Sequence, residues 1–337
     1  MSKQNKNMKK YIAIIGTGYW GKNLVRNFYE LGALKTICDL DKNILKKFEK
    51  LYPNTKTTQN INKILVDKEI KGVVIATPAI THHQLAKKFL KAGKDVFIEK
   101  PLALELKHGQ ELIKLAKNKK CILMVGHILL YHPAVIKLKE LIKKGSLGKI
   151  RYIYSNRLNF GKIRTEENIL WSFAPHDISV IIHLFEKLPK KIYSHGLNWL
   201  NKDVADSTIT YFEIGENQGA HIFVNWLNPF KEQKMAIIGD KKMAVFDDQI
   251  EKKLVIYSHK IEWGHRQNHR IPNAKKALGK TISLPQLEPL REECQHFLNC
   301  IKTRKNPRSD GKEALNVLKV LTACQKSLDN KGKTINL

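Results

Sequence analysis

The stretch "YIAIIGTGYWGKN" at residues 11–23 decides the fold of this chain. Its first residues are mostly apolar and predict a short buried strand, and a helical pattern follows the glycines. The intervening loop has the spacing G-x-G-x-x-G and consists of Gly16, Thr17, Gly18, Tyr19, Trp20 and Gly21. In such a loop the first glycine makes the tight turn, the second admits a pyrophosphate, and the third lets the helix pack on the strand. The stretch therefore predicts a dinucleotide-binding unit.

An acidic residue follows at the position that such a unit requires. Asp39 ends the second predicted strand, and a dinucleotide fold places an acid about 20 residues after the first glycine. A carboxylate there binds the ribose hydroxyls and repels a 2′-phosphate, so NAD is favoured over NADP. Two other interpretations remain open, a loop with incidental glycines and a site for an adenine nucleotide without redox chemistry.

The pattern of strands and helices predicts two domains. Up to about residue 125, apolar runs alternate with amphipathic helices, which is typical of a parallel sheet covered on both faces. From residue 126 onward, longer segments with alternating polarity predict antiparallel strands, with one helix among them and two more near 288–302 and 311–329. The expected fold is α/β, with a doubly wound Rossmann domain at 1–125. An α+β domain with a large, mostly antiparallel open sheet follows at 126–337.

The charge of the chain is strongly positive. The 337 residues carry a formal net charge of +29 from 60 basic and 31 acidic side chains. Nucleic-acid sites favour arginine for bidentate contacts, whereas here lysine predominates and occurs in nearly every segment. We therefore expect a solvated lysine-rich surface and no nucleic-acid partner. The same field would attract an anionic substrate.

Other sequence features suggest the compartment. The longest apolar runs fall short of the roughly 18 residues of a membrane span, and an apolar signal core is lacking behind the basic N-terminus. The 5 cysteines are scattered without a CxxC pair, which favours reduced thiols. The histidines also lack the spacing of a zinc site. A cytoplasmic protein without a metal or a membrane partner is expected.

A lysine stands at the end of a predicted buried strand. In "DVFIEKPLAL", residues 95–104, the apolar run ends at Glu99 and Lys100 and is cut by Pro101. The carboxyl ends of the strands in such a sheet open onto the cofactor crevice. Lys100 is therefore expected to point at the ligand cleft, although an edge lysine that only reaches water is the alternative.

Three segments together resemble a known family. "AIIGTGYWG", "VVIATPAITHHQLAKKFLKAGKDVFIEKPLA" and the tail from "PLREECQHF" to "LTACQKS" are similar to the Gfo/Idh/MocA (glucose–fructose oxidoreductase/inositol dehydrogenase) family. The resemblance implies that Lys100 is catalytic, beside the nicotinamide of NAD, and that the Lys100–Pro101 peptide is cis. It also implies that Thr77, Pro78, His82 and Glu99 lie near the dinucleotide.

The family's second catalytic element resembles the segment "SFAPHDISV". This similarity makes His176 the catalytic histidine, while the position four residues earlier, an aspartate in the family, is Ser172 here. Because a serine cannot supply that carboxylate's charge, we expect His176 and Lys100 to share the acid–base work. A histidine with an ordinary pKa suits a general base at neutral pH. A structural histidine is the alternative.

The substrate is expected to bind to the second domain. The predicted contacts lie around a polar loop upstream of His176 and comprise Arg157, Arg164, Asn168, Trp171 and Asp177. Two arginines there could hold phosphates or carboxylates, although a solvated loop is also possible. This version of the site resembles family members that oxidise the C3 hydroxyl of UDP-N-acetylglucosamine in surface-polysaccharide or lipopolysaccharide biosynthesis. A downstream aminotransferase then takes the ketone. UDP-N-acetylglucosaminuronate, free sugars and inositols remain possible substrates.

The second domain also suggests self-association. Phe212, Ile222, Val224 and Trp226 alternate along two predicted strands, and monomers rarely expose a broad apolar patch. We expect a homodimer or homotetramer formed through the sheet.

One further alternative concerns the function of the whole chain, because this fold also serves in non-enzymatic NAD-binding sensors. Retention of Lys100 and His176 argues against a sensor.

Overall fold

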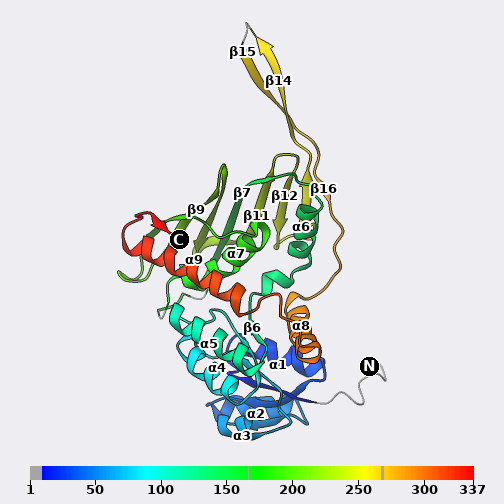
Figure 1. The fold of residues 1–337 in the computed structure, drawn as a ribbon, viewed down its shortest axis with the longest axis vertical. Helices are drawn as coiled ribbons and strands as arrows, with labels where there is room; N and C mark the ends of the chain where they lie inside the picture. Colours follow the sequence, from blue (N-terminus) through cyan, green and yellow to red (C-terminus); the bar gives the residue numbers. More distant parts are fainter. Residues whose placement is uncertain (1–9, 162, 166, 267–268) are drawn as a thin grey trace. The chain divides into compact units, whose positions relative to one another are not determined.

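A computed structural model describes residues 10–161, 163–165, 167–266 and 269–337. The chain forms two compact units, which are described separately (Figure 1). The N-terminal unit contains residues 1–131 and 287–318, and the C-terminal unit contains residues 132–286 and 319–337. The sequence predicted a single division after residue 125. The structure differs because the segment 287–318 returns to the first unit.

The N-terminal unit contains a parallel sheet with the strand order β3-β2-β1-β4-β5-β6. Its strands are β1 (Ile12–Ile15), β2 (Leu34–Cys38), β3 (Lys56–Thr58), β4 (Gly72–Ile75), β5 (Asp95–Ile98) and β6 (Leu123–Val125). This is the order of a dinucleotide-binding fold, so the predicted Rossmann domain is confirmed. The edge strand β3 was not expected, because its three residues are polar and show no apolar run.

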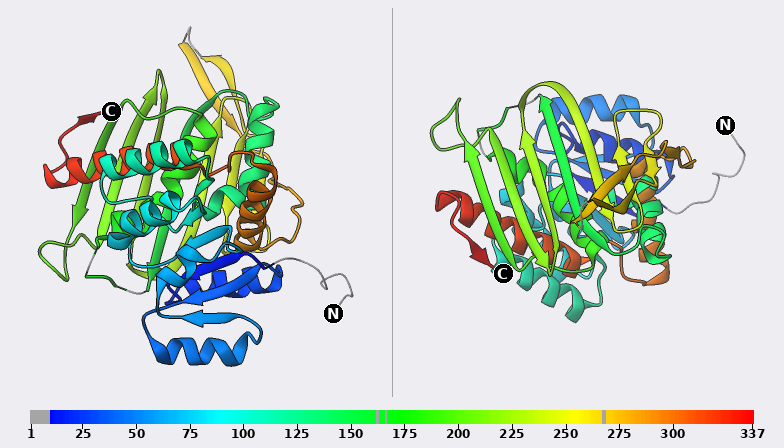
Figure 2. Two further views of the ribbon diagram at one scale, coloured as in Figure 1. Left: turned by 60° about the horizontal axis from the view of Figure 1, so that its bottom comes forward. Right: turned by 90° about the horizontal axis from the view of Figure 1, so that it is seen from above.

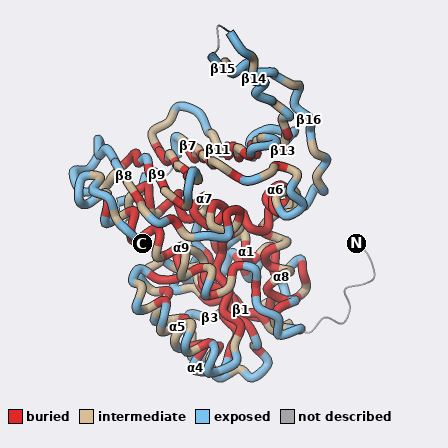
Figure 3. The backbone as a smooth tube through the Cα atoms, turned by 45° about the horizontal axis from the view of Figure 1, so that its top comes forward, coloured by how far each residue is buried: buried red, intermediate tan, exposed pale blue. Residues whose placement is uncertain are grey.

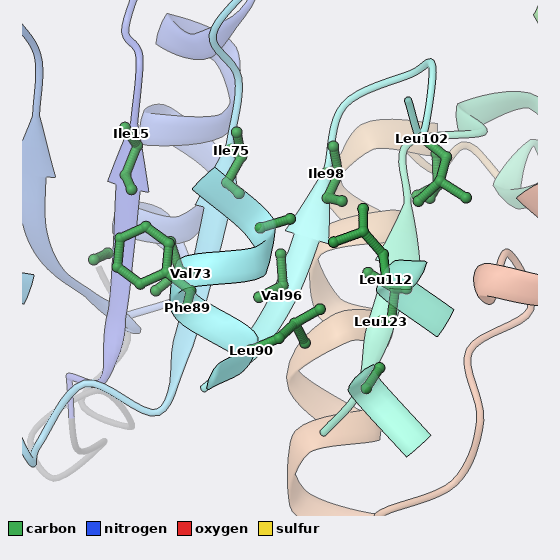
Figure 4. Packing of buried hydrophobic residues seen from close by; sticks show 14 of the residues in the cluster. Ile15, Val73, Ile75, Phe89, Leu90, Val96, Ile98, Leu102, Leu112 and Leu123 are labelled. Carbon is green, nitrogen blue, oxygen red and sulfur yellow. The ribbon is translucent and has the colours of Figure 1, made fainter. Parts of the chain in front are cut away.

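Helices cover both faces of this sheet. They are α1 (Gly21–Glu30), α2 (Lys42–Leu51), α3 (Ile61–Val66), α4 (His82–Lys91), α5 (Leu106–Lys119) and α8 (Pro289–Thr303). On one face, Phe89 and Leu90 of α4 and Leu112 of α5 belong to a cluster of buried apolar side chains that also contains Val73 of β4 and Val96 of β5 (Figure 4). Strands that are buried on both faces need continuous apolar sequence, which explains the patterns that predicted them.

The opposite face of the sheet is covered by α1 and α8. Phe297 of α8 lies at the centre, with its ring centroid 5.6 Å from Phe97 and 6.5 Å from Phe28. All three rings are fully buried. Gly72 completes the contact, because a Cβ there would lie 3.2 Å from the Phe297 ring. The apolar packing of α8 therefore explains why the segment 287–318 belongs to the N-terminal unit.

The C-terminal unit contains a nine-stranded mixed sheet with the order β16-β13-β12-β11-β7-β10-β9-β8-β17. The strands are β7 (Ile150–Phe160), β8 (Lys191–Leu197), β9 (Ser207–Gly215), β10 (Gln218–Asn225), β11 (Leu227–Gly239), β12 (Met243–Asp247), β13 (Leu254–Tyr257), β16 (Lys280–Thr281) and β17 (Ile335–Asn336). Only the β7–β10 pair is parallel, which confirms the expected large, mostly antiparallel sheet. Two exposed strands, β14 (Lys260–Arg266) and β15 (His269–Lys275), form a separate hairpin.

Helices lie against one face of this sheet (Figure 2). They include α6 (Pro133–Lys143), α7 (Ile169–Phe185) and the later part of α9 (Gly311–Asp329). The four residues that were expected to form an exposed patch instead face this layer, and Phe212, Ile222, Val224 and Trp226 are at most 1% exposed. That expectation was wrong because the covering helix α7 supplies the apolar surface from within the chain. Figure 3 colours the backbone by the burial of each residue and shows buried residues in both units.

Two other expectations can be compared with the described residues. None of their helices is long and apolar enough to cross a membrane. All 5 cysteines of the chain are free thiols, and four of them are buried.

The position of Phe297 yields a test of the returning helix. Replacing Phe297 with alanine removes a buried ring between α8 and the sheet, and should lower the free energy of unfolding by about 3–5 kcal/mol. Chemical denaturation followed by circular dichroism measures this loss. Asn299→Ala, an exposed change on the same helix, should stay within about 0.5 kcal/mol of the unchanged protein. Equal losses in both variants would contradict the packing described here.

Candidate active site

The central strands of the N-terminal sheet end in register at one edge. Ile15 of β1 pairs with Ile75 of β4, and Ile75 pairs with Ile98 of β5. The segments that follow these strands therefore begin at the same edge. They contain the glycine loop, Thr77 and Pro78, and Glu99 and Lys100. Parallel register thus brings together most residues that the sequence assigned to the cofactor.

The glycine loop holds helix α1 against the end of β1. Gly16 has φ +85°, a conformation that favours glycine, and a Cβ there would lie 2.8 Å from the Ala76 carbonyl oxygen. A Cβ on Gly21 would lie 2.1 Å from the Gly16 carbonyl oxygen. Both positions therefore require glycine for packing within the chain. At Gly18, by contrast, a Cβ would meet nothing within 4 Å. Space for a ligand, such as a pyrophosphate, explains a glycine at that position.

Asp39 ties the glycine loop to the end of β2. Its Oδ2 accepts hydrogen bonds from the backbone N–H and the hydroxyl of Thr17, both at 2.7 Å, and its Oδ1 accepts from the Asp41 N–H at 3.0 Å. Burial raises the pKa of Asp39, but the hydrogen bonds from Thr17 and Asp41 outweigh this and lower it overall. The group is therefore an anion at neutral pH, as binding of ribose hydroxyls requires.

His82 links the ends of two strands. Its side chain is buried, with Nε2 2.9 Å from the Thr77 carbonyl oxygen and Nδ1 2.8 Å from the Pro101 carbonyl oxygen. The ring thus joins the segment after β4 to the segment after β5. This geometry favours an indirect contribution, in which His82 holds the strand ends that border the site.

Lys100 follows β5 at the carboxyl edge of the sheet, and the Lys100–Pro101 peptide is cis, as the resemblance implied. The preceding residue, Glu99, is partly buried. Trp20 of the glycine loop donates its indole N–H to Glu99 Oε1 at 2.8 Å. The loop and the end of β5 are therefore joined by a side-chain hydrogen bond. Sequence spacing gave no indication of this contact.

The C-terminal unit places His176 and Ser172 on helix α7. Asn168 caps the start of this helix, where its Oδ1 accepts from the Trp171 N–H at 3.2 Å. Ser172 is buried, and His176 is partly buried one turn further along. The helical positions that the sequence assigned to the second catalytic element therefore form one continuous segment, with a serine where a carboxylate was expected.

Two of the expected substrate contacts bind each other instead. Arg157 of β7 donates to Asp177 of α7 through Nε at 2.7 Å and through Nη2 at 3.1 Å, and the Ser155 hydroxyl adds a bond of 2.7 Å. Asp177 is 1% exposed and Arg157 9% exposed. Because their charges compensate each other in a buried ion pair, this geometry favours a structural role in place of the expected substrate contact.

Two further expected contacts are also used within the chain. The Asn168 amide and the Trp171 indole N–H both donate to Gln325 Oε1, at 2.8 Å and 2.9 Å. They anchor the start of α7 to α9, which favours a structural role for both. Arg164 differs, because its side chain is 33% exposed and pairs with Glu167 at 2.9 Å. Of the five expected substrate residues, it retains the most accessible charge.

The fold and the edge of the N-terminal sheet define a dinucleotide-binding oxidoreductase. The open space at Gly18, the anionic Asp39 and the start of α1 match the pyrophosphate and the ribose of such a cofactor. Comparison with known proteins agrees. Residues 10–127 match the family model "Oxidoreductase family, NAD-binding Rossmann fold". Residues 135–245 match the "GFO/IDH/MocA C-terminal domain". The chain therefore belongs to the Gfo/Idh/MocA family and is an oxidoreductase with NAD as its cofactor.

The similar proteins act on several sugars and polyols. A UDP-N-acetylglucosamine 3-dehydrogenase from Acidithiobacillus ferrooxidans is 23% identical over 90% of this chain and 93% of its own. Its solved structure has a TM-score of 0.83 at 20% identity and covers 96% of this chain and 99% of its own. A scyllo-inositol 2-dehydrogenase (NAD(+)) from Bacillus subtilis is 24% identical over 88% of this chain and 87% of its own.

The glycine loop yields a test that separates cofactor binding from folding. In Gly18→Ala, the added methyl group meets nothing in the chain, so the free energy of unfolding should change by less than about 0.5 kcal/mol. The affinity for NAD should fall about tenfold or more, because the methyl group occupies the space through which a pyrophosphate would pass. Isothermal titration with NAD measures the affinity.

The matched variant is Gly21→Ala, in which the new Cβ would collide with the Gly16 carbonyl oxygen. It should lower the stability of the unit as well as the affinity for NAD. If Gly18→Ala binds NAD as tightly as the unchanged protein, the proposed position of the pyrophosphate is wrong.

Proposed function

We propose that this enzyme oxidises a ring hydroxyl, at C3, of a nucleotide sugar such as UDP-N-acetylglucosamine. The observation that carries the proposal is Lys100, which follows β5 at the same sheet edge as the glycine loop. The similarity to a UDP-N-acetylglucosamine 3-dehydrogenase over nearly the whole chain supports this substrate class. The product would be a 3-keto sugar for surface-polysaccharide or lipopolysaccharide biosynthesis, with an aminotransferase as the next enzyme. The free thiols suit a cytoplasmic location.

The proposed chemistry assigns the acid–base work to Lys100 and His176. NAD supplies the hydride acceptor when it is bound. Lys100 Nζ takes the hydroxyl proton as the hydride leaves, and His176 shares this acid–base work. Arg164, which keeps a partly exposed guanidinium, is the candidate among the five expected residues for holding an anionic group of the substrate. Asp39 disfavours a 2′-phosphate, which accounts for NAD rather than NADP.

The alternatives differ in the substrate or in the absence of turnover. UDP-N-acetylglucosaminuronate, a free sugar or an inositol would use the same ring-hydroxyl chemistry. The similarity to a scyllo-inositol 2-dehydrogenase (NAD(+)) specifically supports the hypothesis that the substrate is an inositol. A non-enzymatic NAD sensor is disfavoured by the lysine at the strand end and by the membership in an oxidoreductase family.

A substrate panel tests the proposal. NAD and a series of UDP-sugars, free sugars and inositols are added to the enzyme, and nicotinamide fluorescence reports reduction. An aminotransferase with glutamate removes the ketone. A signal with a UDP-N-acetylated sugar should fall about 100-fold or more in Lys100→Ala, while NAD still binds. Lys91→Ala, an exposed change on α4, should retain turnover. A signal with inositols alone would overturn the nucleotide-sugar assignment.

We also propose that the enzyme is a homodimer or homotetramer formed through the open face of the nine-stranded sheet. We define this open face by Tyr152, Tyr154, Tyr193, Tyr211 and His221. Their rings form a row in which Tyr152 and Tyr211 lie 6.4 Å apart, Tyr193 and Tyr211 6.0 Å, and Tyr154 and His221 5.5 Å.

The residues of the open face are typical of a contact with a second copy of the chain rather than of a solvent-exposed surface. Tyr211 is 41% exposed and its neighbour Ile209 is 50% exposed. A depression of about 470 Å³, which Arg151, Tyr152 and Tyr211 help to line, opens on the same strands. Aromatic side chains are enriched at protein interfaces, whereas lysine, which covers much of this chain, is depleted there.

Tyr211→Lys tests this interface, because it places a charge in the centre of the aromatic row. We expect the variant to run as a smaller species than the unchanged protein in multi-angle light scattering. Ile250→Lys makes a similar change at an exposed turn, where Ile250 is 49% exposed, and should leave the mass unchanged. A monomeric unchanged protein would refute the oligomer outright.

A further inference from the structure

The N-terminal unit contains two carboxyl side chains that are close enough to influence each other, Glu99 next to Lys100 and Glu293 on α8. Glu99 lies two residues after Phe97 and thus on the same face of β5 and its extension, while Glu293 lies one helical turn before Phe297 on α8. The Phe97 and Phe297 rings are in contact, with centroids 5.6 Å apart. Glu99 and Glu293 lie on the same side of this contact, one on the strand end and one on the helix. The contact therefore brings the two carboxyls close together.

Glu293 lies in apolar surroundings. It is 1% exposed, and its helical neighbours Leu290, Cys294 and Phe297 are buried too. Among the described residues, neither of its carboxyl oxygens has a hydrogen-bond partner. Burial raises the pKa of Glu293 well above its ordinary value, and the charge of Glu99 raises it further. An isolated buried carboxylate is costly, so this carboxyl keeps its proton.

Glu99 is surrounded by groups that favour its ionised form. Burial raises the pKa of Glu99 to about 7, and the Trp20 indole N–H, the charge of Lys100 and the Lys100 backbone N–H each oppose this rise. Gly126 packs against the carboxyl group so closely that a Cβ there would lie 2.9 Å from Oε2. Of the two carboxyls, Glu99 is therefore the first to lose a proton.

Other titratable groups adjoin the pair. His127 also lowers the pKa of Glu99, and its Nδ1 lies 2.6 Å from Glu313 Oε2. Burial, the largest cause, raises the pKa of the Cys294 thiol, which lies beside Glu293 on α8. At the start of α8, Glu288 forms an ion pair with Arg26. None of these groups donates to Glu293, so they leave its proton in place.

We propose that Glu99 and Glu293 hold one proton between them, with the proton on Glu293 and the negative charge on Glu99 beside Lys100. This inference rests on the proposed role of Lys100 in proton transfer. Glu293 is then a positioning residue, because its neutral form avoids a second negative charge and lets Glu99 stay ionised. The Glu99 charge favours protonated Lys100, and it thereby sets the pH above which Lys100 can accept the hydroxyl proton.

Infrared spectroscopy tests the pair without any turnover. At mildly alkaline pH, where exposed carboxyls are ionised, the full-length protein should show the C=O stretch of a protonated carboxylic acid. The band should disappear in Glu293→Gln and persist in Glu292→Gln, which makes the same change one residue earlier at a less buried position. Circular dichroism checks that both variants fold. An unchanged protein without this band, or a band that survives in Glu293→Gln, would overturn the proposal.

The pH dependence of turnover at saturating NAD tests the link to Lys100. Oxidation requires neutral Lys100, so the rate rises with pH through the pKa of this lysine. Glu99→Gln removes the neighbouring negative charge, lowers that pKa and should move the rise to lower pH by roughly one unit. Glu293→Gln keeps the charge on Glu99 and should leave the rise in place. A shift to lower pH in Glu293→Gln, or an immobile profile in Glu99→Gln, would contradict the charge assignment.

The two tests also separate this inference from the proposed function. If the infrared band behaves as expected but no substrate is turned over, the pair of carboxyls stands and the assigned reaction is wrong. If turnover depends on Lys100 but the band is missing, the reaction stands and the shared proton is wrong.

Discussion

The close contact between Gly21 and Gly16 is the constraint on which the site depends. A side chain at Gly21 would collide with the Gly16 carbonyl oxygen, so the first residue of α1 packs directly on the loop after β1. The start of the helix is thereby held at the edge where β4 and β5 also end. Because a helix start carries partial positive charge, this contact positions the anion-binding end of α1. Asp39 fixes the same loop from the other side through Thr17.

The same loop also contacts Glu99, the neighbour of the proposed acid–base group Lys100. Trp20 lies between the glycines that favour a dinucleotide, and its indole N–H donates to Glu99, the neighbour of Lys100. A hydrogen bond to a buried carboxylate favours the ionised form of that carboxylate. The loop that would hold the cofactor thus helps to keep a negative charge beside the lysine. Under the proposed roles, Trp20 links cofactor binding to the protonation of Lys100 within the N-terminal unit.

The sequence predicted the features of the fold that depend on a local pattern of residues. It did not predict the features that depend on contacts between distant segments. The glycine spacing, the apolar strands and the lysine after β5 depend on neighbouring residues, and the structure places them as expected. β3 was missed because three polar residues at a sheet edge leave no periodic signal. The return of α8 depends on Phe297 meeting rings far away in the sequence. The sequence places a glutamate, Glu293, on the apolar side of that helix, which is unusual for a charged residue. Its proposed role could not be predicted, because it depends on Glu99, which is distant in the sequence.

The pairing of Arg157 with Asp177 bears on the source of the charge that controls Lys100. In the resembling family, a carboxylate stands four residues before the catalytic histidine, whereas this chain has a buried Ser172. Asp177, the nearby acid on α7, is neutralised by a bidentate arginine. Within the described part of that helix, neither position carries an uncompensated negative charge. In the proposed assignment the N-terminal unit supplies one instead, because Glu99 loses its proton near neutral pH next to Lys100 while Glu293 keeps the shared proton. A serine at position 172 is therefore compatible with acid–base catalysis by Lys100.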